Sequence, residues 1–261
     1  MSVEQTAEPK AAPNAPRARI LTRGNAPSIA YHRREGKTPG VLFLTGFMSD
    51  MSGSKAVAID EFCATRGHAY VRFDYRGHGQ SDGAFEDADI GTWLADTLDV
   101  FDNLTEGPQI LVGSSMGGWM MLLLARARPE RVKALVGIAA APDFTERLEA
   151  AMTPEHRAEI AATGRVVVPS IYGSDYVFTR GLISSGRFHR LLEDGIAFDG
   201  PVRLLQGTAD HAVPWETALR IQAALTSKDV EVTLIKDGDH RLSEPADLVR
   251  MTDVLATLLD R

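Results

Sequence analysis

Short apolar runs alternate with amphipathic segments along most of the chain, and this alternation restricts the possible folds more than any other feature. The apolar runs, each suited to one strand, lie at 41–44, 69–73, 109–112, 132–139, 201–205 and 230–235. Apolar residues recur with a helical period at 54–66, 90–104, 117–128, 214–226 and 244–259. Strands and helices that alternate in this way predict an α/β fold, a mostly parallel sheet with helices on both faces.

Two further runs and one long interruption complete the expected organisation. The runs around 18–22 and 28–33 have no helix between them, so we expect them to begin the sheet as an antiparallel pair and to bring it to eight strands. The interval 142–199 is much longer than a usual connection. We interpret it as a lid or cap insertion within one domain at 18–261, preceded by a flexible tail at 1–17 that is rich in Ala and Pro.

Composition and charge exclude several classes of partner. The chain of 261 residues has 28 Lys plus Arg and 35 Asp plus Glu, a formal net charge of −7, so nucleic acid and anionic membranes are not expected to bind it. No apolar run approaches the ~20 residues of a spanning helix. The N-terminus has no secretory signal, and residues 1–17 lack the pattern of a transit peptide, so we expect a cytoplasmic protein. The sequence leaves the oligomeric state open and is compatible with a monomer.

Two serines lie in a G-x-S-x-G pattern, and their surroundings differ. A nucleophilic serine needs an exposed position, a backbone donor beside it and a base within reach, which a strand that turns sharply into a helix supplies. Ser115 follows the apolar run ILV and precedes the apolar helical pattern WMMLLLARA, whereas its neighbour Ser114 misses the apex of the turn. Ser81, in GHGQSDG, is followed by AFEDAD. We therefore predict that Ser115 is the nucleophile and that Ser81 lies in a glycine-rich turn.

The expected architecture places a base and an acid later in the chain, each just after a strand. His240 follows the run VEVTLIK, and Asp210 follows VRLLQG. Singly, such residues are often a surface histidine and a helix-capping aspartate. Their order after three strands of one sheet favours a catalytic triad, in which Asp210 orients His240 and His240 takes the proton of Ser115.

Other titratable residues fit different roles. His156 and His189 lie in the insertion and follow no strand, and His211 is expected to face solvent. Asp237 and Asp239 are expected to form the turn that carries the base. The scattered histidines and the single cysteine form no metal-ligand pattern, and no glycine-rich phosphate loop is present, so we expect neither a metal nor another cofactor.

An acyl-transfer site also needs an oxyanion hole and a place for the acyl chain. In this architecture the two amide donors follow the nucleophile and an early strand, which points to the N–H groups of Met116 and Phe47. Aromatic and apolar residues near these positions and in the insertion are candidates for the acyl pocket, with ordinary core packing as the alternative. They are Met48, Trp119, Phe144, Tyr172, Tyr176 and Phe178.

Several long strings resemble the α/β-hydrolase superfamily, and more closely its mitochondrial branch of palmitoyl-protein thioesterases and acyl-glucuronide esterases. The strings are FLTGFMSDMSGSKAVAIDEFC, RFDYRGHGQSDG, GPQILVGSSMGGWMMLLLARARPERVKALVGIAAA, RLLQGTADHAVPW and DGDHR. The resemblance extends from Gly40 to the C-terminus and is weakest at 142–199. It implies the α/β-hydrolase fold and the same triad and oxyanion positions.

The expected function is that of a serine hydrolase which cleaves acyl thioesters or esters through an acyl-enzyme. The resemblance implies a palmitoyl-thioesterase-like activity on a small-molecule or acyl-protein substrate, without a cofactor. A carboxylesterase that acts on short-chain or acyl-glucuronide oxygen esters is the close alternative. A ligand-binding protein that keeps the fold without catalysis is the alternative from a different class.

Overall fold

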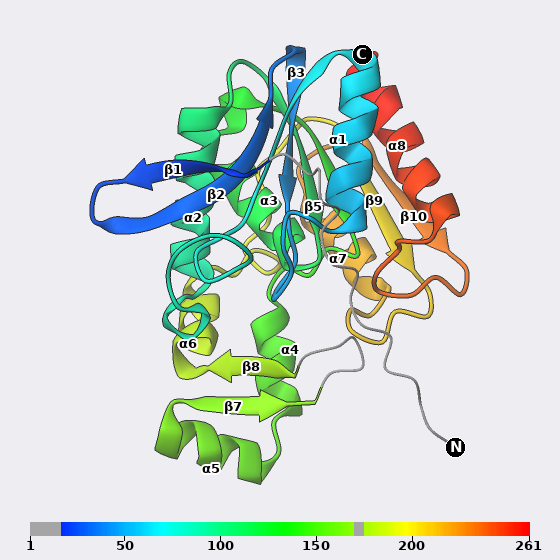
Figure 1. Ribbon diagram of the computed structural model, residues 1–261. Coiled ribbons are helices and arrows are strands. Elements are labelled where there is room, and N and C mark those ends of the chain that lie inside the picture. The colour runs from blue at the N-terminus through cyan, green and yellow to red at the C-terminus, as the bar shows by residue number, and fades with distance from the viewer. Residues whose placement is uncertain (1–16, 170–174) are drawn as a thin grey trace, which may run out of the picture.

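The computed structural model describes residues 17–169 and 175–261 (Figure 1). In this part of the chain the main sheet has eight strands, in the spatial order β1-β2-β4-β3-β5-β6-β9-β10. The strands are β1 (Arg19–Arg23), β2 (Ala26–Arg34), β3 (Lys37–Leu44), β4 (His68–Phe73), β5 (Gln109–Ser114), β6 (Val132–Ile138), β9 (Val202–Gly207) and β10 (Val230–Ile235). Strand β2 is antiparallel to its neighbours, and the other neighbouring pairs are parallel. The predicted α/β fold with a mostly parallel, eight-stranded sheet is therefore confirmed.

Side chains that alternate along the central strands divide the core into two layers. In β3, Val41 and Phe43 pack with α1 and α8, which lie side by side in Figure 1. Leu42 and Leu44 point to the opposite face and pack in a cluster that includes α2, α3 and α7. The helices that cover the sheet are α1 (Ser54–Arg66), α2 (Ile90–Leu104), α3 (Met116–Ala127), α7 (Glu216–Ala224) and α8 (Pro245–Leu259).

Local sequence signals account for several helix ends. Asp89 caps α2: its carboxylate accepts a hydrogen bond from the N–H of Thr92 at 2.9 Å, and the Thr92 hydroxyl accepts one from the N–H of Asp89 at 2.8 Å. Helix α1 ends at Gly67, whose φ of 71° is left-handed and suits glycine. Helix α7 begins two residues later than predicted, because the N–H of Thr217 bonds to the carbonyl of Pro214 in a separate turn.

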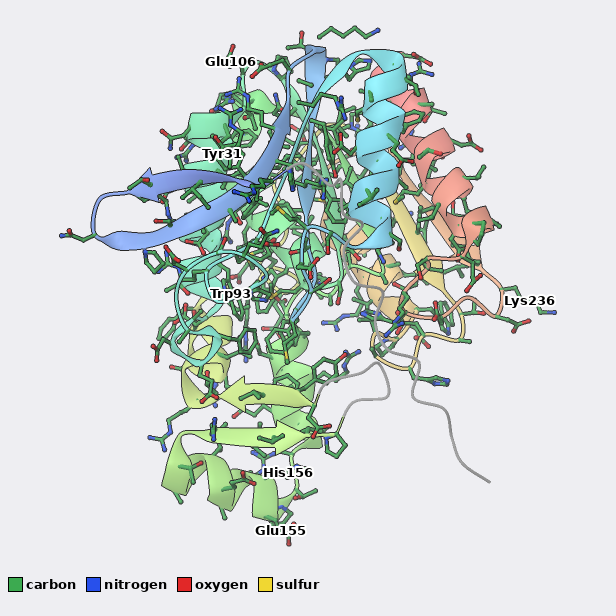
Figure 2. All side chains as sticks on the ribbon, viewed as in Figure 1. Tyr31, Trp93, Glu106, Glu155, His156 and Lys236 are labelled. Atoms are coloured by element: carbon green, nitrogen blue, oxygen red, sulfur yellow. The ribbon has the colours of Figure 1, made fainter. Side chains whose placement is uncertain are left out.

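The expected insertion contains helices and a second small sheet within its described residues. Its elements are α4 (Phe144–Ala151), α5 (Pro154–Thr163), β7 (Arg165–Val168), β8 (Tyr176–Thr179) and α6 (Arg180–Phe188). They lie together beyond the end of the main sheet (Figure 1), with Glu155 and His156 of α5 at the outer end (Figure 2). Buried Val166, Phe178 and Leu182 belong to the same cluster as α2 and α3. The insertion therefore shares a core with the helices of one sheet face.

A fully buried carboxylate joins the first hairpin to helix α2. Asp96, with 0% exposure, pairs at 2.6 Å with Arg23 and also at 2.6 Å with Arg76. The hydrogen bond and charge of Asp96 raise the pKa of Arg76. Removing Asp96 leaves Arg23 its second carboxylate partner, Asp99 at 2.9 Å, but takes the paired carboxylate from the largely buried Arg76, and breaking a buried pair in this way is costly.

We expect Asp96→Ala to lower the free energy of unfolding by about 3 kcal/mol, measured by urea denaturation followed by circular dichroism. Asp102→Ala is the matched control on the same helix, because Asp102 pairs with Arg128 at 2.7 Å on the surface. An exposed pair contributes only about 0–1 kcal/mol. Equal losses in the two variants would contradict the role assigned to Asp96.

Candidate active site

Ser115 lies at the sharp turn between strand β5 and helix α3. Its backbone has φ 53° and ψ −120°, a conformation that residues other than glycine rarely adopt. Glycines allow strand and helix to pass closely here. A β-carbon on Gly113 would lie 2.4 Å from the carbonyl oxygen of Gly117, and one on Gly117 would lie 2.0 Å from that of Leu44. Ser115 therefore has the strand-turn-helix geometry of an exposed nucleophile.

Ser115, His240 and Asp210 form a continuous hydrogen-bonded chain. Ser115 Oγ lies 3.0 Å from His240 Nε2, and His240 Nδ1 lies 2.8 Å from Asp210 Oδ2. Asp210 follows β9 and His240 follows β10, and these paired parallel strands bring both side chains to the sheet edge at which β5 ends. A hydrogen on Nδ1, donated to the carboxylate, leaves the lone pair of Nε2 facing the serine. The three predicted triad residues are thus brought together.

Four donors hold the Asp210 carboxylate. Besides His240, these are Gln206 Nε2 at 2.9 Å, the N–H of Ala212 at 2.8 Å and the N–H of Val213 at 2.7 Å. Burial by itself raises the pKa of Asp210, but the hydrogen bond and charge of His240 and the N–H of Val213 outweigh it and hold the pKa below its ordinary value. The carboxylate is therefore ionised at neutral pH. Gln206 was missed from sequence, although a polar residue near the end of the run VRLLQG was the signal.

The loop that carries His240 is fixed by its own turn and by helix α1. Asp237 has a left-handed φ of 58°, and Asp239 Oδ1 accepts a hydrogen bond from the N–H of Leu242 at 3.0 Å, so both aspartates form the turn as expected. Lys55 of α1 donates to the carbonyl of Arg241 at 2.5 Å. Burial lowers the pKa of Lys55 to about 8. This lysine was not among the predicted site residues.

The residues set aside from the triad lie elsewhere. The Ser81 hydroxyl is bonded to the backbone of β2 and of the turn after β4. Ser114 is buried at the end of β5. His211 is exposed and His156 is half-buried, and the ring of His189, just after helix α6, lies 2.8 Å from the carbonyl of Ser185 in that helix. Their positions agree with the choice of Ser115 and His240.

Phe47 lies beside Ser115 in the loop after β3. A β-carbon on Gly46 would be 3.4 Å from the β-carbon of Ser115, so the loop and the elbow are in contact. Phe47 occupies a central position of a turn that is closed by the N–H of Ser49 and the carbonyl of Gly46, at 3.2 Å. Among the residues that the structure describes, neither the N–H of Phe47 nor that of Met116 has an acceptor. Two unused amide donors are therefore present at the predicted oxyanion positions.

The ring of Phe47 is covered by aromatic residues of the insertion. It stacks on Phe178 with a centroid distance of 5.5 Å and an interplanar angle of 17°. It also lies 5.8 Å from Phe144 and 6.0 Å from Tyr176. Trp119 of α3 extends this cluster through an edge-on contact with Phe144 at 5.6 Å. Four of the predicted pocket residues thus form one aromatic cluster around Phe47.

The two other predicted pocket residues do not belong to that cluster. Met48 is 36% exposed, and Tyr172 lies outside the described residues. Sequence reasoning missed Phe85 and Trp93, whose rings lie 5.1 Å and 5.9 Å from that of Phe47. Trp93, labelled in Figure 2, is buried. Both precede Ser115 by more than twenty residues, so only the folded chain reveals their contact with the loop after β3.

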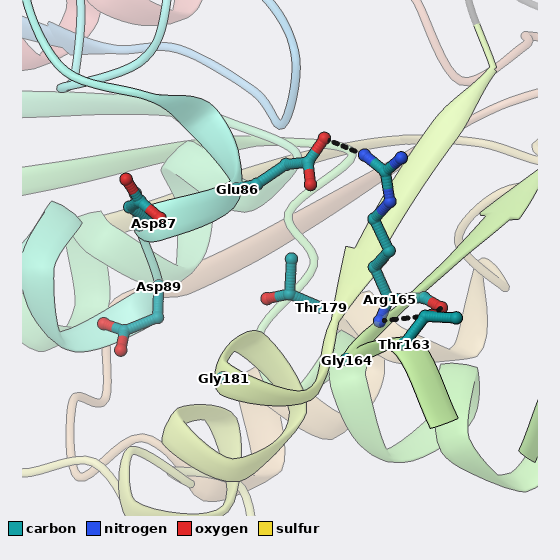
Figure 3. Close-up of a pocket in the computed structure, with 9 residues that line it drawn as sticks. Glu86, Asp87, Asp89, Thr163, Gly164, Arg165, Thr179 and Gly181 are labelled. Atoms are coloured by element: carbon teal, nitrogen blue, oxygen red, sulfur yellow. Dashed lines mark hydrogen bonds and ion pairs between the residues drawn. The ribbon is translucent and has the colours of Figure 1, made fainter. Parts of the chain in front are cut away.

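Two cavities adjoin the insertion, and Ser115 lines neither of them. One, of about 270 Å³, lies between the insertion and the short helix η1 (Phe85–Asp87), where Arg165 pairs with Glu86 (Figure 3). The other, of about 350 Å³, is lined by Arg147 of α4 and by residues of the loop after Asp210. Arg147 also donates a hydrogen bond to the carbonyl of Ala212. The insertion therefore contacts the loop after Asp210 as well as Phe47.

Comparison with known proteins identifies the family. Residues 39–163 match the family described as the alpha/beta hydrolase fold. Over 244 residues the chain is 44% identical to the mitochondrial palmitoyl-protein thioesterase ABHD10 of Mus musculus and 42% identical to that of Homo sapiens. The chain belongs to the α/β-hydrolase family. These matches cover 93% of this chain and 82% and 80% of the two relatives, and they confirm the resemblance found in the sequence.

Solved structures of relatives superpose closely on this α/β hydrolase. The mouse alpha/beta hydrolase domain-containing protein 10 is 44% identical, with a TM-score of 0.87 over 93% of this chain and 98% of its own. A protein from Agrobacterium vitis S4 that is described as a hydrolase is 40% identical, with a TM-score of 0.88 over 93% of this chain and 97% of its own. The shared fold thus includes nearly the whole of both structures.

The relatives correct the expected location of the protein. The expectation of a cytoplasmic protein rested on residues 1–17, which lack the pattern of a transit peptide. The ABHD10 relatives from mouse, cattle, rat and human are mitochondrial proteins, and the cytoplasmic expectation is wrong. Residues 1–17 are a short part of the chain, and their composition does not determine where the protein is located. The similarity to the mitochondrial relatives extends over 93% of the chain.

No helix at 17–169 or 175–261 is long and apolar enough to cross a bilayer. Within the same residues, no group of three or more His, Cys, Asp or Glu side chains is placed to hold a metal ion.

We expect Asp210→Asn to lower kcat by about 10⁴-fold, because an amide no longer fixes the Nδ1–H tautomer of His240. Hydrolysis of an activated ester measures kcat, and circular dichroism verifies the fold. Gln206→Leu is the matched control: it removes one of the four hydrogen bonds to the carboxylate and should lower kcat far less. An Asp210→Asn variant with the wild-type kcat would contradict the proposed pairing with His240.

Proposed function

We propose that this protein is a serine hydrolase that cleaves acyl thioesters of proteins, as a palmitoyl-protein thioesterase does. The observation that carries the proposal is the hydrogen-bonded chain from Ser115 through His240 to Asp210 at a strand-helix elbow. The substrate class comes from the ABHD10 palmitoyl-protein thioesterases, to which the chain is 42–44% identical. The insertion at 142–199 would act as a lid within a single domain at 18–261.

The proposed cycle has two acyl-transfer steps. His240 Nε2 takes the proton of Ser115, whose oxygen attacks the thioester carbonyl, and the N–H groups of Phe47 and Met116 donate to the resulting oxyanion. The intermediate collapses, the carbon–sulfur bond breaks, and His240 returns the proton to the departing thiolate. His240 then takes a proton from water, whose oxygen attacks the acyl-enzyme; the carboxylic acid leaves, and His240 returns the proton to the Ser115 oxygen. Each oxyanion donor contributes roughly 10²- to 10³-fold in rate.

The aromatic cluster around Phe47 supports a long acyl chain as the substrate group. Phe144, Tyr176 and Phe178 place apolar rings against the residue whose amide would hold the oxyanion. An acyl chain that enters between these rings gains about 0.8 kcal/mol for each buried CH₂. The catalytic efficiency kcat/KM should therefore rise with chain length.

Substrate preference tests the proposal. We would measure kcat/KM for acyl thioesters and matched oxygen esters from acetyl to palmitoyl, with Ser115→Ala as the blank. We expect Ser115-dependent turnover that is fastest for long thioesters. Preferred cleavage of short or glucuronate oxygen esters would replace the thioesterase assignment with that of a carboxylesterase. If the wild type hydrolyses none of these substrates faster than the Ser115→Ala blank does, the protein is instead a ligand-binding protein.

The two serines of the G-x-S-x-G pattern provide a matched pair of variants. Ser115→Ala should lower kcat on the order of 10⁶-fold, by comparison with a dissected triad. Ser81→Ala removes a hydroxyl that donates to the carbonyl of Asp74 and accepts from the N–H of Ala30. It should lower the free energy of unfolding by about 1–2 kcal/mol and kcat far less than Ser115→Ala does. A comparable collapse of kcat in both variants would show that the wrong serine was chosen.

A further inference from the structure

The second G-x-S-x-G turn lies against the loop that presents the Phe47 amide. This turn spans residues 74–83, and we refer to residues 45–51 as the oxyanion loop. Ser81 fixes the turn to its surroundings through hydrogen bonds of 2.6 Å and 2.8 Å to backbone groups. The proposed reaction gives this turn no task. Its side chains, however, point to the oxyanion loop at two places.

Asp74 holds the far end of the oxyanion loop. Its Oδ1 accepts a hydrogen bond from the N–H of Met51 at 2.7 Å, and its Oδ2 accepts one from the N–H of Gln80 at 2.8 Å. Arg72, two residues earlier, donates to the carbonyl of Met51. Both backbone groups of Met51 are thus tied to the end of β4 and the turn that follows.

His78 holds the near end of the same loop. Its Nε2 accepts a hydrogen bond from the N–H of Met48 at 3.2 Å, and Met48 follows Phe47 directly. Met48 has a φ of 53°, in the left-handed region that non-glycine residues enter at a cost of roughly 1–2 kcal/mol. A conformation of this kind persists only where its surroundings enforce it. The bond from His78 is one contact that does so.

The surroundings of His78 keep it neutral and in one tautomer. The side chain is 4% exposed and lies edge-on to the rings of Tyr75, Phe85 and Trp93. Its Nδ1 lies 3.3 Å from the carbonyl of Arg76, which can only accept, so Nδ1 carries the hydrogen and Nε2 the lone pair.

Burial outweighs the charges that face His78. It lowers the pKa of His78, against the bond to the carbonyl of Arg76 and the carboxylates of Asp96 on α2 and Asp50 on the oxyanion loop. Asp74 lies in the same turn, and burial raises its pKa to about 6. At neutral pH His78 is therefore an acceptor for Met48.

We propose that His78 is a positioning residue of the oxyanion hole. By accepting the N–H of Met48, it fixes the turn in which the N–H of Phe47 remains free to meet the oxyanion. This inference rests on the proposed function, because it assumes that Phe47 donates to a reacting carbonyl. In this proposal the second G-x-S-x-G turn positions the oxyanion loop, and its serine, Ser81, is not a nucleophile.

Two substitutions at His78 and one control test the inference in the full-length protein. His78→Leu fills the site with an apolar side chain and removes the acceptor, whereas His78→Gln places an amide oxygen where it can accept the N–H of Met48. The control is His68→Leu, at a buried histidine that lies 2.8 Å from the carbonyl of Pro39 at the opposite end of the sheet. Thermal denaturation verifies the fold, and palmitoyl-thioester hydrolysis gives kcat and KM.

We expect His78→Leu to lower kcat by about 10- to 100-fold with little change in KM, since a misplaced oxyanion donor affects the transition state more than substrate binding. His78→Gln should recover most of kcat, and His68→Leu should retain it. A wild-type kcat in His78→Leu would overturn the inference. A decrease of kcat in His78→Gln as large as that in His78→Leu would also overturn it. An equally large decrease in the control His68→Leu would overturn it as well.

The pH dependence gives a second readout that needs only His78→Gln. Protonation turns the Nε2 of His78 into a donor, whereas glutamine does not titrate, so the ratio of kcat in His78→Gln to kcat in the wild type should rise from neutral to acid pH. The other titratable groups are the same in both proteins, so their contributions cancel from the ratio. A ratio that falls toward acid pH would overturn the inference, even where His78→Leu fails to fold.

Failure of the proposed function gives a different pattern. If thioester hydrolysis in the wild type persists unchanged in Ser115→Ala, the triad assignment is wrong and His78 has no oxyanion hole to position. If hydrolysis depends on Ser115 but not on the acceptor at position 78, the function holds and only the inference about His78 is wrong.

Discussion

The close approach of strand β5 and helix α3 at Ser115 is the constraint on which the site depends. The strained backbone of Ser115 is held by three hydrogen bonds: its N–H donates to Ile138 at 2.9 Å, and its carbonyl accepts from Gly118 at 2.8 Å and Ala141 at 3.0 Å. Both Ile138 and Ala141 belong to the end of β6 and the segment after it. The sheet therefore enforces the conformation that projects the serine hydroxyl.

Parallel topology then brings the remaining groups to that point. Strands β9 and β10 end beside β5 and β6 and carry Asp210 and His240, while the loop after β3 carries Phe47. The insertion contacts two of these loops, through the ring of Phe178 on Phe47 and through Arg147 on the loop after Asp210. A change in the insertion can thus reach the oxyanion donor and the acid through direct packing.

The sequence predicted the features that depend on local pattern and strand order. The apolar run before Gly113 and the apolar helix after Ser115 predicted the elbow, and the turns after two later strands predicted where His240 and Asp210 lie. The two-stranded sheet of the insertion was not predicted, because its short strands carry little periodicity. Gln206 and His78 were missed as supporting residues, since each acts through a tertiary hydrogen bond that no local pattern encodes.

The expected location was wrong for a different reason, because it was inferred from the composition of a terminal segment and not from the fold.

The most direct test of the central claim, that Ser115 carries the acyl group, is mass spectrometry of peptides from enzyme quenched during turnover of a palmitoyl thioester. The account predicts one palmitoyl group on the peptide that contains Ser115, and none on that peptide in Ser115→Ala. Steady turnover with the acyl group on Ser81, or on no residue of the protein, would contradict it.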